Sequence, residues 1–188
     1  ITGSNSQLLS SELSTLLAGR YVEFVIETLS FSEYLDFKDD EEKDIYKLFS
    51  QYLKLGGFPA IHAYNYDVDS AYKIVSDIYS SVILRDTIQR HNIRNVDQLN
   101  RIMRFILVNI GNLFSAKSIS DYFVSQKRKI DVNTVYNYLS AIESAYIIRR
   151  VNRYNLKGKE VLKTNEKFYL SDHALLYALM GYDSQWIS

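Results

Sequence analysis

Polar and basic side chains between positions 127 and 163 have types and spacing that suit contact with a nucleic acid. On the segment VNTVYNYLS, we expect Asn133, Thr134 and Asn137 on the exposed face of a helix, followed by Tyr138 and Ser140. Asn and Thr side chains suit base edges and phosphates, and Lys and Arg suit phosphates. The cations expected towards the tip of a following hairpin are Arg153, Lys157, Lys159 and Lys163. These residues together predict a DNA-binding site.

The helix that carries these polar side chains has an unusual charge for a helix that contacts bases. It contains no Lys or Arg, and Asp131 lies near its start. Basic residues instead precede it at positions 127–129 and follow it from Arg149 and Arg150 onward. A protein-interaction module, with a solvated basic hairpin and no nucleic acid, is therefore an alternative that the sequence leaves open.

Charge is distributed unevenly, although 22 basic and 22 acidic residues give a formal net charge of zero. Residues 1–112 contain 11 basic and 15 acidic residues, whereas residues 113–171 contain 11 basic and 5 acidic residues. The chain as a whole has no field that would attract it to a nucleic acid or an anionic membrane. Any such surface must be local, and the C-terminal segment is the candidate for it.

The motifs of common catalytic sites are absent from this sequence. It has no G-x-x-x-x-G-K-[ST] phosphate loop, no Gly-rich dinucleotide fingerprint and no G-x-S-x-G nucleophile turn. Its histidines, His62, His91 and His173, lack metal-ligand spacing, and the lack of cysteine excludes disulfides, thiolate zinc sites and Cys nucleophiles. We expect no metal site and no complete catalytic apparatus in these residues.

The elements that would position the polar and basic residues are those of a winged helix-turn-helix over residues 113–188. A short helix is expected in SAKSISDYFVSQKRK and a longer one in DVNTVYNYLSAIESAYI. The longer helix has one core-facing stripe, made of Val132, Val135, Tyr136, Leu139 and Ile142. Two strands joined by a turn around Gly158 then form a hairpin. Helix, turn, helix and hairpin is the order of a winged helix-turn-helix.

Residues 37–112 are predicted to form a helical, lid-like bundle with short connections. The acidic residues at 39–42 suit the first turn of a helix, which the glycine pair at 56–57 ends. Two more helices are expected over residues 69–90 and 96–110.

Residues 1–36 are expected to form a separate α/β piece. A strand ends at the first two residues, a helix covers residues 8–17 before Gly19, and the alternation in YVEFVIETLSF predicts a second strand. The fold class is therefore mainly α with small β elements: an α/β piece, a helical bundle and a winged helix-turn-helix. With 47% hydrophobic residues in 188, the chain can form a substantial core.

The sequence shows no signal for a membrane or a secretory route. No apolar run approaches the roughly 20 residues that span a bilayer, and the N-terminal stretch lacks a basic region leading into an apolar one. We therefore expect a cytoplasmic protein without a membrane partner.

Segments along nearly the whole chain resemble a known family. The first are ITGSN, LLSSEL, LAGRY and LSFSEYL; later ones are GGFP, ILRDTIQRHNI, SAKSISDYF, NTVYNYLSAIESAYIIRRVNRY and KFYLSDHALLYALMGY. In this order they are similar to prokaryotic AAA-like P-loop ATPases, whose ATPase domain is followed by a helical and winged-helix region of unassigned function. The resemblance implies that residues 1–36 are the C-terminal part of a P-loop domain.

The resemblance also implies roles for three residues near the start. Ser4, or else Asn5, would occupy the sensor position near the γ-phosphate, where a short neutral side chain orients water or phosphate. Arg20 would face phosphate, in cis or across a subunit interface, as an arginine finger does. A turn residue that caps the next helix, for Ser4, and a surface arginine, for Arg20, are the structural alternatives.

The chain departs from this family at both ends. The phosphate loop and the Mg²⁺-binding acidic strand would precede residue 1, and a nuclease-like domain would follow Ser188. We therefore expect a truncated fragment that neither binds ATP and Mg²⁺ nor hydrolyses ATP, although its parent does. The expected partners are DNA, the missing ATPase core and the nuclease-like domain of its own parent.

Overall fold

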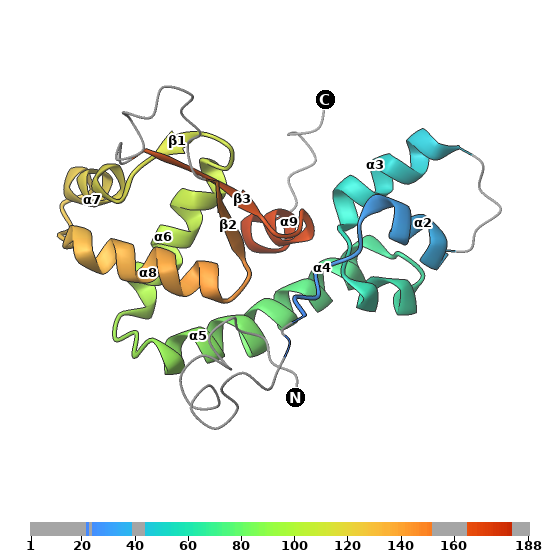
Figure 1. Ribbon diagram of the computed structural model, residues 1–188, viewed down its shortest axis with the longest axis horizontal. Helices are drawn as coiled ribbons and strands as arrows, with labels where there is room; N and C mark the ends of the chain where they lie inside the picture. The colour runs from blue at the N-terminus through green and yellow to red at the C-terminus, as the bar shows by residue number, and fades with distance from the viewer. Residues whose placement is uncertain (1–21, 23, 39–43, 152–164, 182–188) are drawn as a thin grey trace.

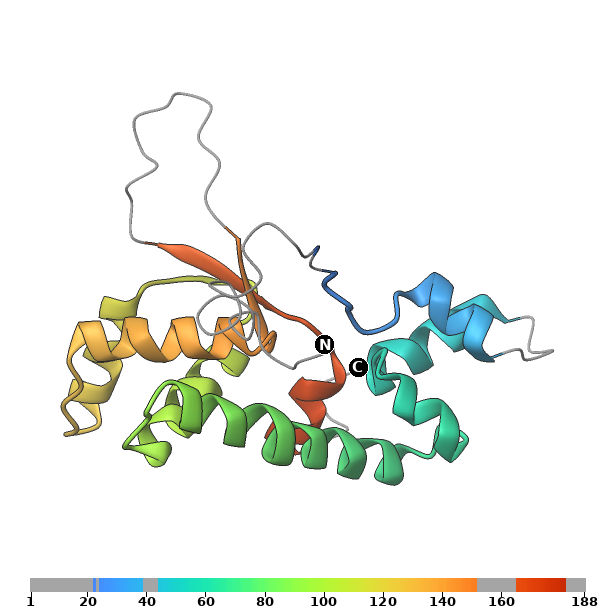
Figure 2. The ribbon, with the colours of Figure 1, turned by 60° about the horizontal axis from the view of Figure 1, so that its bottom comes forward.

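The computed structural model describes residues 22, 24–38, 44–151 and 165–181. In this part of the chain the fold is mainly helical, with one small antiparallel sheet of three strands (Figure 1). Two groups of elements lie at opposite ends of a long helical segment, and the last helix lies between them (Figure 2). The polar residues of interest belong to the larger, C-terminal group.

The N-terminal group is small and rich in aromatic side chains. It consists of α2 (Phe31–Lys38), α3 (Ile45–Leu55) and the 3₁₀-helix η1 (Pro59–Tyr64). The Asp44 carboxylate caps α3 by accepting bonds from the next backbone N–H groups, and Gly56 ends it with φ 76°. Tyr34 is fully buried. Its ring packs against those of Phe31, Tyr52, His62 and Tyr66.

A nearly continuous helical segment over residues 68–90 joins the two groups. It consists of α4 (Val68–Ile78), the π-helical turn η2 (Tyr79–Leu84) and α5 (Arg85–Arg90). Asp67 caps its start by accepting a bond of 2.9 Å from the Ser70 N–H. The helix predicted over residues 69–90 is confirmed, and its central π-helical turn was not expected.

The C-terminal group contains the sheet and the remaining helices. Its elements are α6 (Val96–Val108), β1 (Leu113–Phe114), α7 (Ala116–Ser125), α8 (Val132–Ser144), β2 (Ile148–Val151), β3 (Glu166–Leu170) and α9 (Ala174–Met180). The strands lie in the order β1-β3-β2, with Leu113 opposite Lys167 and Ile148 opposite Leu170. The predicted helix over residues 96–110, the helix pair and the hairpin strands are confirmed.

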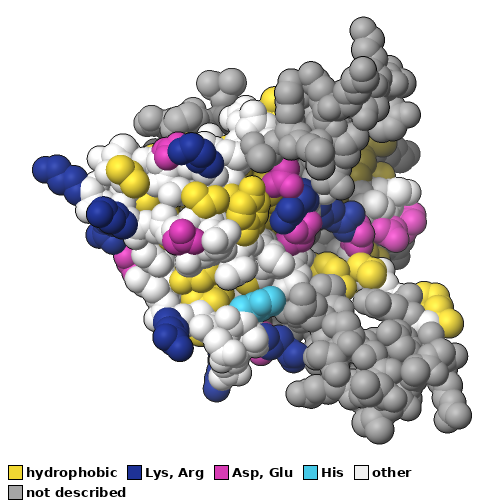
Figure 3. All heavy atoms as spheres, turned by 60° about the vertical axis from the view of Figure 1, so that its left-hand side comes forward, with side chains coloured by type: hydrophobic (Ala, Val, Ile, Leu, Met, Phe, Trp, Pro, Cys, Tyr) yellow, Lys and Arg dark blue, Asp and Glu magenta, His cyan; other side chains and the backbone are white. Residues whose placement is uncertain are grey.

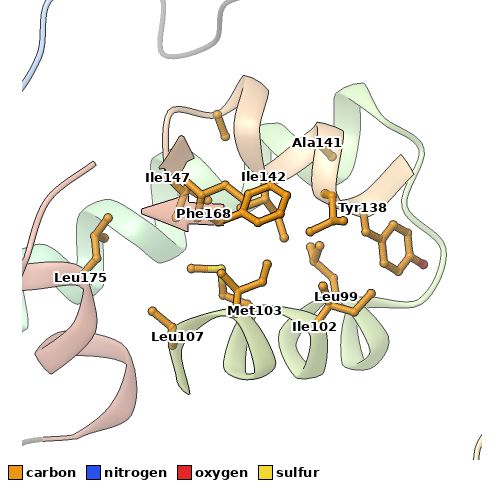
Figure 4. Packing of buried hydrophobic residues seen from close by; sticks show 14 of the residues in the cluster. Leu99, Ile102, Met103, Leu107, Tyr138, Ala141, Ile142, Ile147, Phe168 and Leu175 are labelled. Carbon is orange, nitrogen blue, oxygen red and sulfur yellow. The ribbon is translucent and has the colours of Figure 1, made fainter. Parts of the chain in front are cut away.

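The core of the C-terminal group lies where α6, α8 and β3 meet (Figure 4). Leu99, Ile102 and Met103 on α6 lie opposite Tyr138 and Ile142 on α8. Phe168 of β3 is also buried here, and its ring stacks on that of Phe114 with 4.9 Å between centroids. Side-chain caps fix the starts of the three helices: Asn95 for α6, Ser115 for α7 and Asp131 for α8. Each cap fixes the residue at which its helix begins.

The strand predicted in YVEFVIETLSF is wrong for the residues that the structure describes. Residues 24–30 have no regular secondary structure, and α2 begins at Phe31. Phe24 and Ile26 are 80% and 88% exposed. Within the described ranges no strand lies alongside to pair with their backbone, and without such a partner an alternating sequence does not form a sheet.

The polar face predicted for α8 also needs one correction. Tyr138 is buried, with 7% of its surface exposed, whereas Tyr136, predicted in the core stripe, is 37% exposed. Tyr138 follows Thr134 by one helical turn, but its ring points into the space between α8 and α6 (Figure 4). The helix predicted over residues 8–17 and the turn around Gly158 lie outside the described residues.

Candidate nucleic-acid interface

The polar face of α8 borders a hollow of about 500 Å³, which we call the α8 hollow. Thr134, Asn137, Tyr138 and Ser140 line it from α8. The opposite wall is the turn between α5 and α6 and the first turn of α6, which contribute His91, Asn92, Arg94, Asn95 and Gln98. Two segments about forty residues apart in the sequence thus place amides, hydroxyls and a guanidinium around one space.

The α5–α6 turn is held against α8 by a buried side chain and a polar contact. Ile93 is buried in the core of the C-terminal group, with 7% of its surface exposed. His91 Nε2 lies 3.0 Å from the Ser144 Oγ on α8. Asn92 has φ 49°, a left-handed conformation that Asn tolerates and that turns the chain sharply after α5. The wall of the hollow is therefore a fixed turn.

The electrostatics of the α8 hollow come from the turn and not from α8. Arg94 is exposed and supplies the cation that α8 lacks. Partial burial holds the pKa of His91 below its usual value, and the neighbouring Arg90 adds to this. The lowered pKa favours the uncharged form of His91 at neutral pH, and Arg94 supplies the positive charge on the lining.

The predicted contact residues divide into three sets. Thr134 and Asn137 line the α8 hollow, and of the described residues none forms a hydrogen bond with either side chain. Asn133 is exposed beside it, and its backbone N–H donates to the Asp131 carboxylate over 2.8 Å. The remaining predicted site residues, Ser4, Asn5, Arg20, Arg153, Lys157, Lys159 and Lys163, lie outside the described residues.

Two arginines of the predicted basic hairpin already have carboxylate partners. Arg150 bonds to Glu143 and Glu166 over 2.9 Å and 3.0 Å, and its side chain is only 25% exposed. Arg149 forms an ion pair with Glu27 in the segment before α2. Their charges are thus used within the protein, so a phosphate grip by the hairpin would depend on its other cations.

Arg94 and the amides that share its wall were not predicted from the sequence. They lie in RHNIRN, which has two Arg and two Asn in six residues, an unusual density of groups that suit phosphates and base edges. That density was the available signal. It gave no indication that this turn would lie beside α8.

In a second polar region, which we call the junction, the turn after α3 bonds both to the segment before α2 and to the C-terminal group. Asp172 is 4% exposed, and its two carboxylate oxygens accept bonds from the Gly57 N–H over 2.8 Å and the Ala174 N–H over 2.9 Å. The Leu29 N–H donates to the Gly57 carbonyl over 2.8 Å, and the Tyr52 hydroxyl donates to the Leu29 carbonyl over 2.9 Å. The polar groups of the junction thus form hydrogen bonds with one another.

Asp172 is a structural acceptor in the junction. Burial raises the pKa of its carboxyl, although the hydrogen bonds from the Thr28 side chain and from the Gly57 and Ala174 N–H groups act in the opposite direction. A side chain at position 56 has no space beside Asp172, because a Cβ on Gly56 would lie 1.9 Å from its Oδ1. The described residues contain no group of three or more His, Asp or Glu able to hold a metal ion.

Two family models match different parts of the chain. Residues 1–35 match the family model of an AAA domain. Residues 46–185 match the model of a domain of unknown function, DUF8612, and since this is most of the chain, the protein belongs to that family.

Two relatives match over nearly the whole chain. An uncharacterized protein of Haemophilus influenzae is 37% identical over 183 residues, which are 96% of this chain and 45% of the relative. An uncharacterized protein of Methanocaldococcus jannaschii is 33% identical over 182 residues, 92% of this chain and 40% of the relative. The chain spans less than half the length of these relatives. No solved structure matches it, and no helix in the described ranges has the length and apolar character needed to cross a bilayer.

Proposed function

We propose that the winged helix-turn-helix predicted over residues 113–188 forms together with α6 and binds DNA through the α8 hollow and the following hairpin. The observation that carries this proposal is the element order α6, β1, α7, α8, β2, β3 with sheet order β1-β3-β2. This is the order of a winged helix-turn-helix, in which the second helix of the motif enters the major groove. On this proposal, α8 would be that helix.

The lining of the α8 hollow supports a nucleic-acid ligand. Asn137 and Thr134 have the groups that suit base edges and phosphates, and Arg94 supplies a phosphate contact from beside the helix. The helix itself has no cation, so this neighbour gives the proposed site the charge that α8 lacks. The sequence adds Arg153, Lys157, Lys159 and Lys163 to the hairpin.

The proposal is tested by the salt dependence of binding to a labelled DNA duplex, followed by fluorescence anisotropy. The chain should bind at about 50 mM salt, and affinity should fall steeply towards about 200 mM because phosphate contacts release counterions. Arg94→Ala should reduce the slope of log K against log salt by about one, and joint replacement of Lys157, Lys159 and Lys163 by Ala by about three.

The matched control is Lys73→Ala, which removes an exposed cation from α4, far along the chain from the proposed site. It should leave affinity and slope unchanged. Absence of duplex and single-strand binding at the lower salt would refute the DNA proposal. An equal effect of Arg94→Ala and Lys73→Ala would refute the placement of the site at the α8 hollow.

The full-length protein is proposed to be an AAA-like ATPase that uses ATP and Mg²⁺. Support comes from the AAA match over residues 1–35 and from relatives more than twice as long as the matched region. Ser4 or Asn5 would orient the attacking water, and Arg20 would contact phosphate. The full-length protein should hydrolyse ATP and lose most of this activity on Arg20→Ala, whereas tight ATP binding by the present chain alone would contradict the proposal.

A protein-interaction module is the second candidate function. It is favoured by the carboxylate partners of Arg149 and Arg150, which occupy two hairpin cations, and by the α5–α6 turn, which covers part of the α8 face. Absence of nucleic-acid binding in the salt titration is the result that this alternative predicts.

A further inference from the structure

A groove of about 480 Å³ lies between α6 and α7, on a different face of α6 from the core. We call it the arginine groove. Arg101, Arg104 and Val108 line it from α6, Tyr122 lines it from α7, and Arg128 lines it from the turn before α8. On the molecular face that includes α7 and α8, Lys and Arg side chains lie around exposed hydrophobic ones, with Asp and Glu side chains among them (Figure 3).

The floor of the arginine groove is aromatic and partly open. The rings of Phe105 and Tyr122 lie 5.2 Å apart, and Phe105 also packs against Phe114 of β1 at 5.6 Å. Tyr122 is 46% exposed and Val108 is 66% exposed. The floor is thus anchored in the core at one end and offers unburied apolar surface at the other.

The rim of the groove has an excess of positive charge. Of the described residues that line it, none is an Asp or Glu. Asp97 lies near one end and is shared by two of the arginines, because its Oδ2 bonds to both Arg101 and Arg128 over 2.9 Å. Arg104 forms no ion pair with any described residue. One carboxylate therefore offsets three guanidinium groups.

We propose that the arginine groove binds an acidic segment of a protein partner that also carries a large apolar side chain. The apolar side chain would cover Val108 and Tyr122, and a flanking carboxylate would pair with Arg104, which has no ion-pair partner among the described residues. Arg and Tyr are the side chains enriched at the centres of protein interfaces. A nucleic acid would satisfy the arginines but would leave the aliphatic surface of Val108 without a partner, so a peptide fits the groove better.

The site is separate from the α8 hollow, so its test is independent of the proposed DNA binding. The probe is a fluorescein-labelled peptide of glutamates interrupted by one tryptophan and two leucines at helical spacing. The matched peptide has glutamine in place of every glutamate. The chain should bind the acidic peptide, and its affinity should exceed that for the glutamine peptide by at least about ten-fold at low salt.

Variants locate the binding on the molecule. Arg104→Glu and Val108→Glu change exposed positions and should each weaken peptide binding by about ten-fold or more without lowering the melting temperature. Arg94→Glu, at the α8 hollow, should leave peptide binding unchanged while it weakens DNA binding.

Three results would overturn the proposal. The first is absence of binding by the acidic peptide, and the second is equal binding by Arg104→Glu and the unmodified chain. The third is efficient displacement of the peptide by a single-stranded oligonucleotide whose own binding is lost in Arg104→Glu. That result would assign the groove to nucleic acid instead.

Discussion

The junction and the α8 hollow are both built from polar groups, but they use these groups in opposite ways. In the junction, both Asp172 carboxylate oxygens accept bonds from buried N–H groups, and a Cβ on Gly56 would collide with one of these oxygens. In the α8 hollow, Thr134 and Asn137 have no partner among the described side chains and backbone groups, and they face open space. Polar groups whose hydrogen bonds are all made within the protein stabilise the fold. Polar groups that lie close together without such partners are available to a ligand.

The largest effect is expected at Gly57, where the junction has no space for a side chain. A Cβ at this position would lie 2.1 Å from the Leu29 carbonyl oxygen, which is backbone and cannot turn away. Gly57→Ala should therefore lower the free energy of unfolding by about 3 kcal/mol or more, measured by urea denaturation. Gly111→Ala is the matched control, because Gly111 has φ 76° but its nearest neighbour would be 3.7 Å away. It should cost about 1–2 kcal/mol.

The next effect in size is expected at Asp172. Asp172→Ala leaves the buried N–H groups of Gly57 and Ala174 without acceptors, so the free energy of unfolding should fall by about 2–4 kcal/mol. Asp172→Asn retains one acceptor oxygen, so its free energy of unfolding should lie between those of the unmodified protein and Asp172→Ala. A smaller loss for the alanine variant than for the asparagine variant would show that these bonds do not stabilise the junction.

Unlike Asp172→Ala, Asn137→Ala should leave stability nearly unchanged and weaken DNA binding. The side chain is exposed and has no partner among the described residues, so the free energy of unfolding should change by less than about 0.5 kcal/mol. DNA affinity should fall by about five-fold or more, because the amide is proposed to contact a base edge. Asn100→Ala, an exposed amide on α6, is the control for both measurements. A stability loss like that of Asp172→Ala would remove the contrast between the two regions.

The smallest effect is expected from the pH dependence of stability. Because burial lowers the pKa of His91, the unfolded chain binds a proton at a higher pH than the folded protein does. This histidine's contribution is therefore fully present above about pH 6.5 and is lost as the pH falls through the folded-state pKa. His91→Gln should flatten the acidic side of the curve of unfolding free energy against pH. Parallel profiles for the unmodified chain and His91→Gln would contradict this.

The helices over residues 68–108 and the motif from α7 to β3 could be predicted because their signals are local. Asn95 and Asp131 are capping residues at the start of apolar stripes, and Gly56 and Gly111 interrupt the pattern where helices end. The pattern failed at residues 24–30, because the fate of an alternating segment depends on a neighbouring strand. It also missed β1, which is only two residues long.

Of the α8 hollow, the side formed by α8 could be predicted from the sequence, and the side formed by the α5–α6 turn could not. Thr134 and Asn137 follow from helical spacing on one segment, and the structure places both on the lining. Arg94 belongs to a different turn, and its position beside α8 depends on how Ile93 and His91 pack. The arginine groove was missed entirely, because Arg104 and Arg128 come from separate elements and neither lies in a recognisable motif.

The π-helical turn at Tyr79–Leu84 sets the rotation of everything that follows it. Val75 and Thr87 are both buried, yet twelve residues of regular α-helix would turn them about a third of a circle apart. A π-helical turn accommodates about one residue more than an α-helical turn and cancels most of this angle. Deleting one residue from the turn would therefore preserve the alignment in a regular helix. Converting the π-helical turn to regular α-helix without deleting a residue would rotate the α5–α6 turn, and Arg94 with it, away from α8.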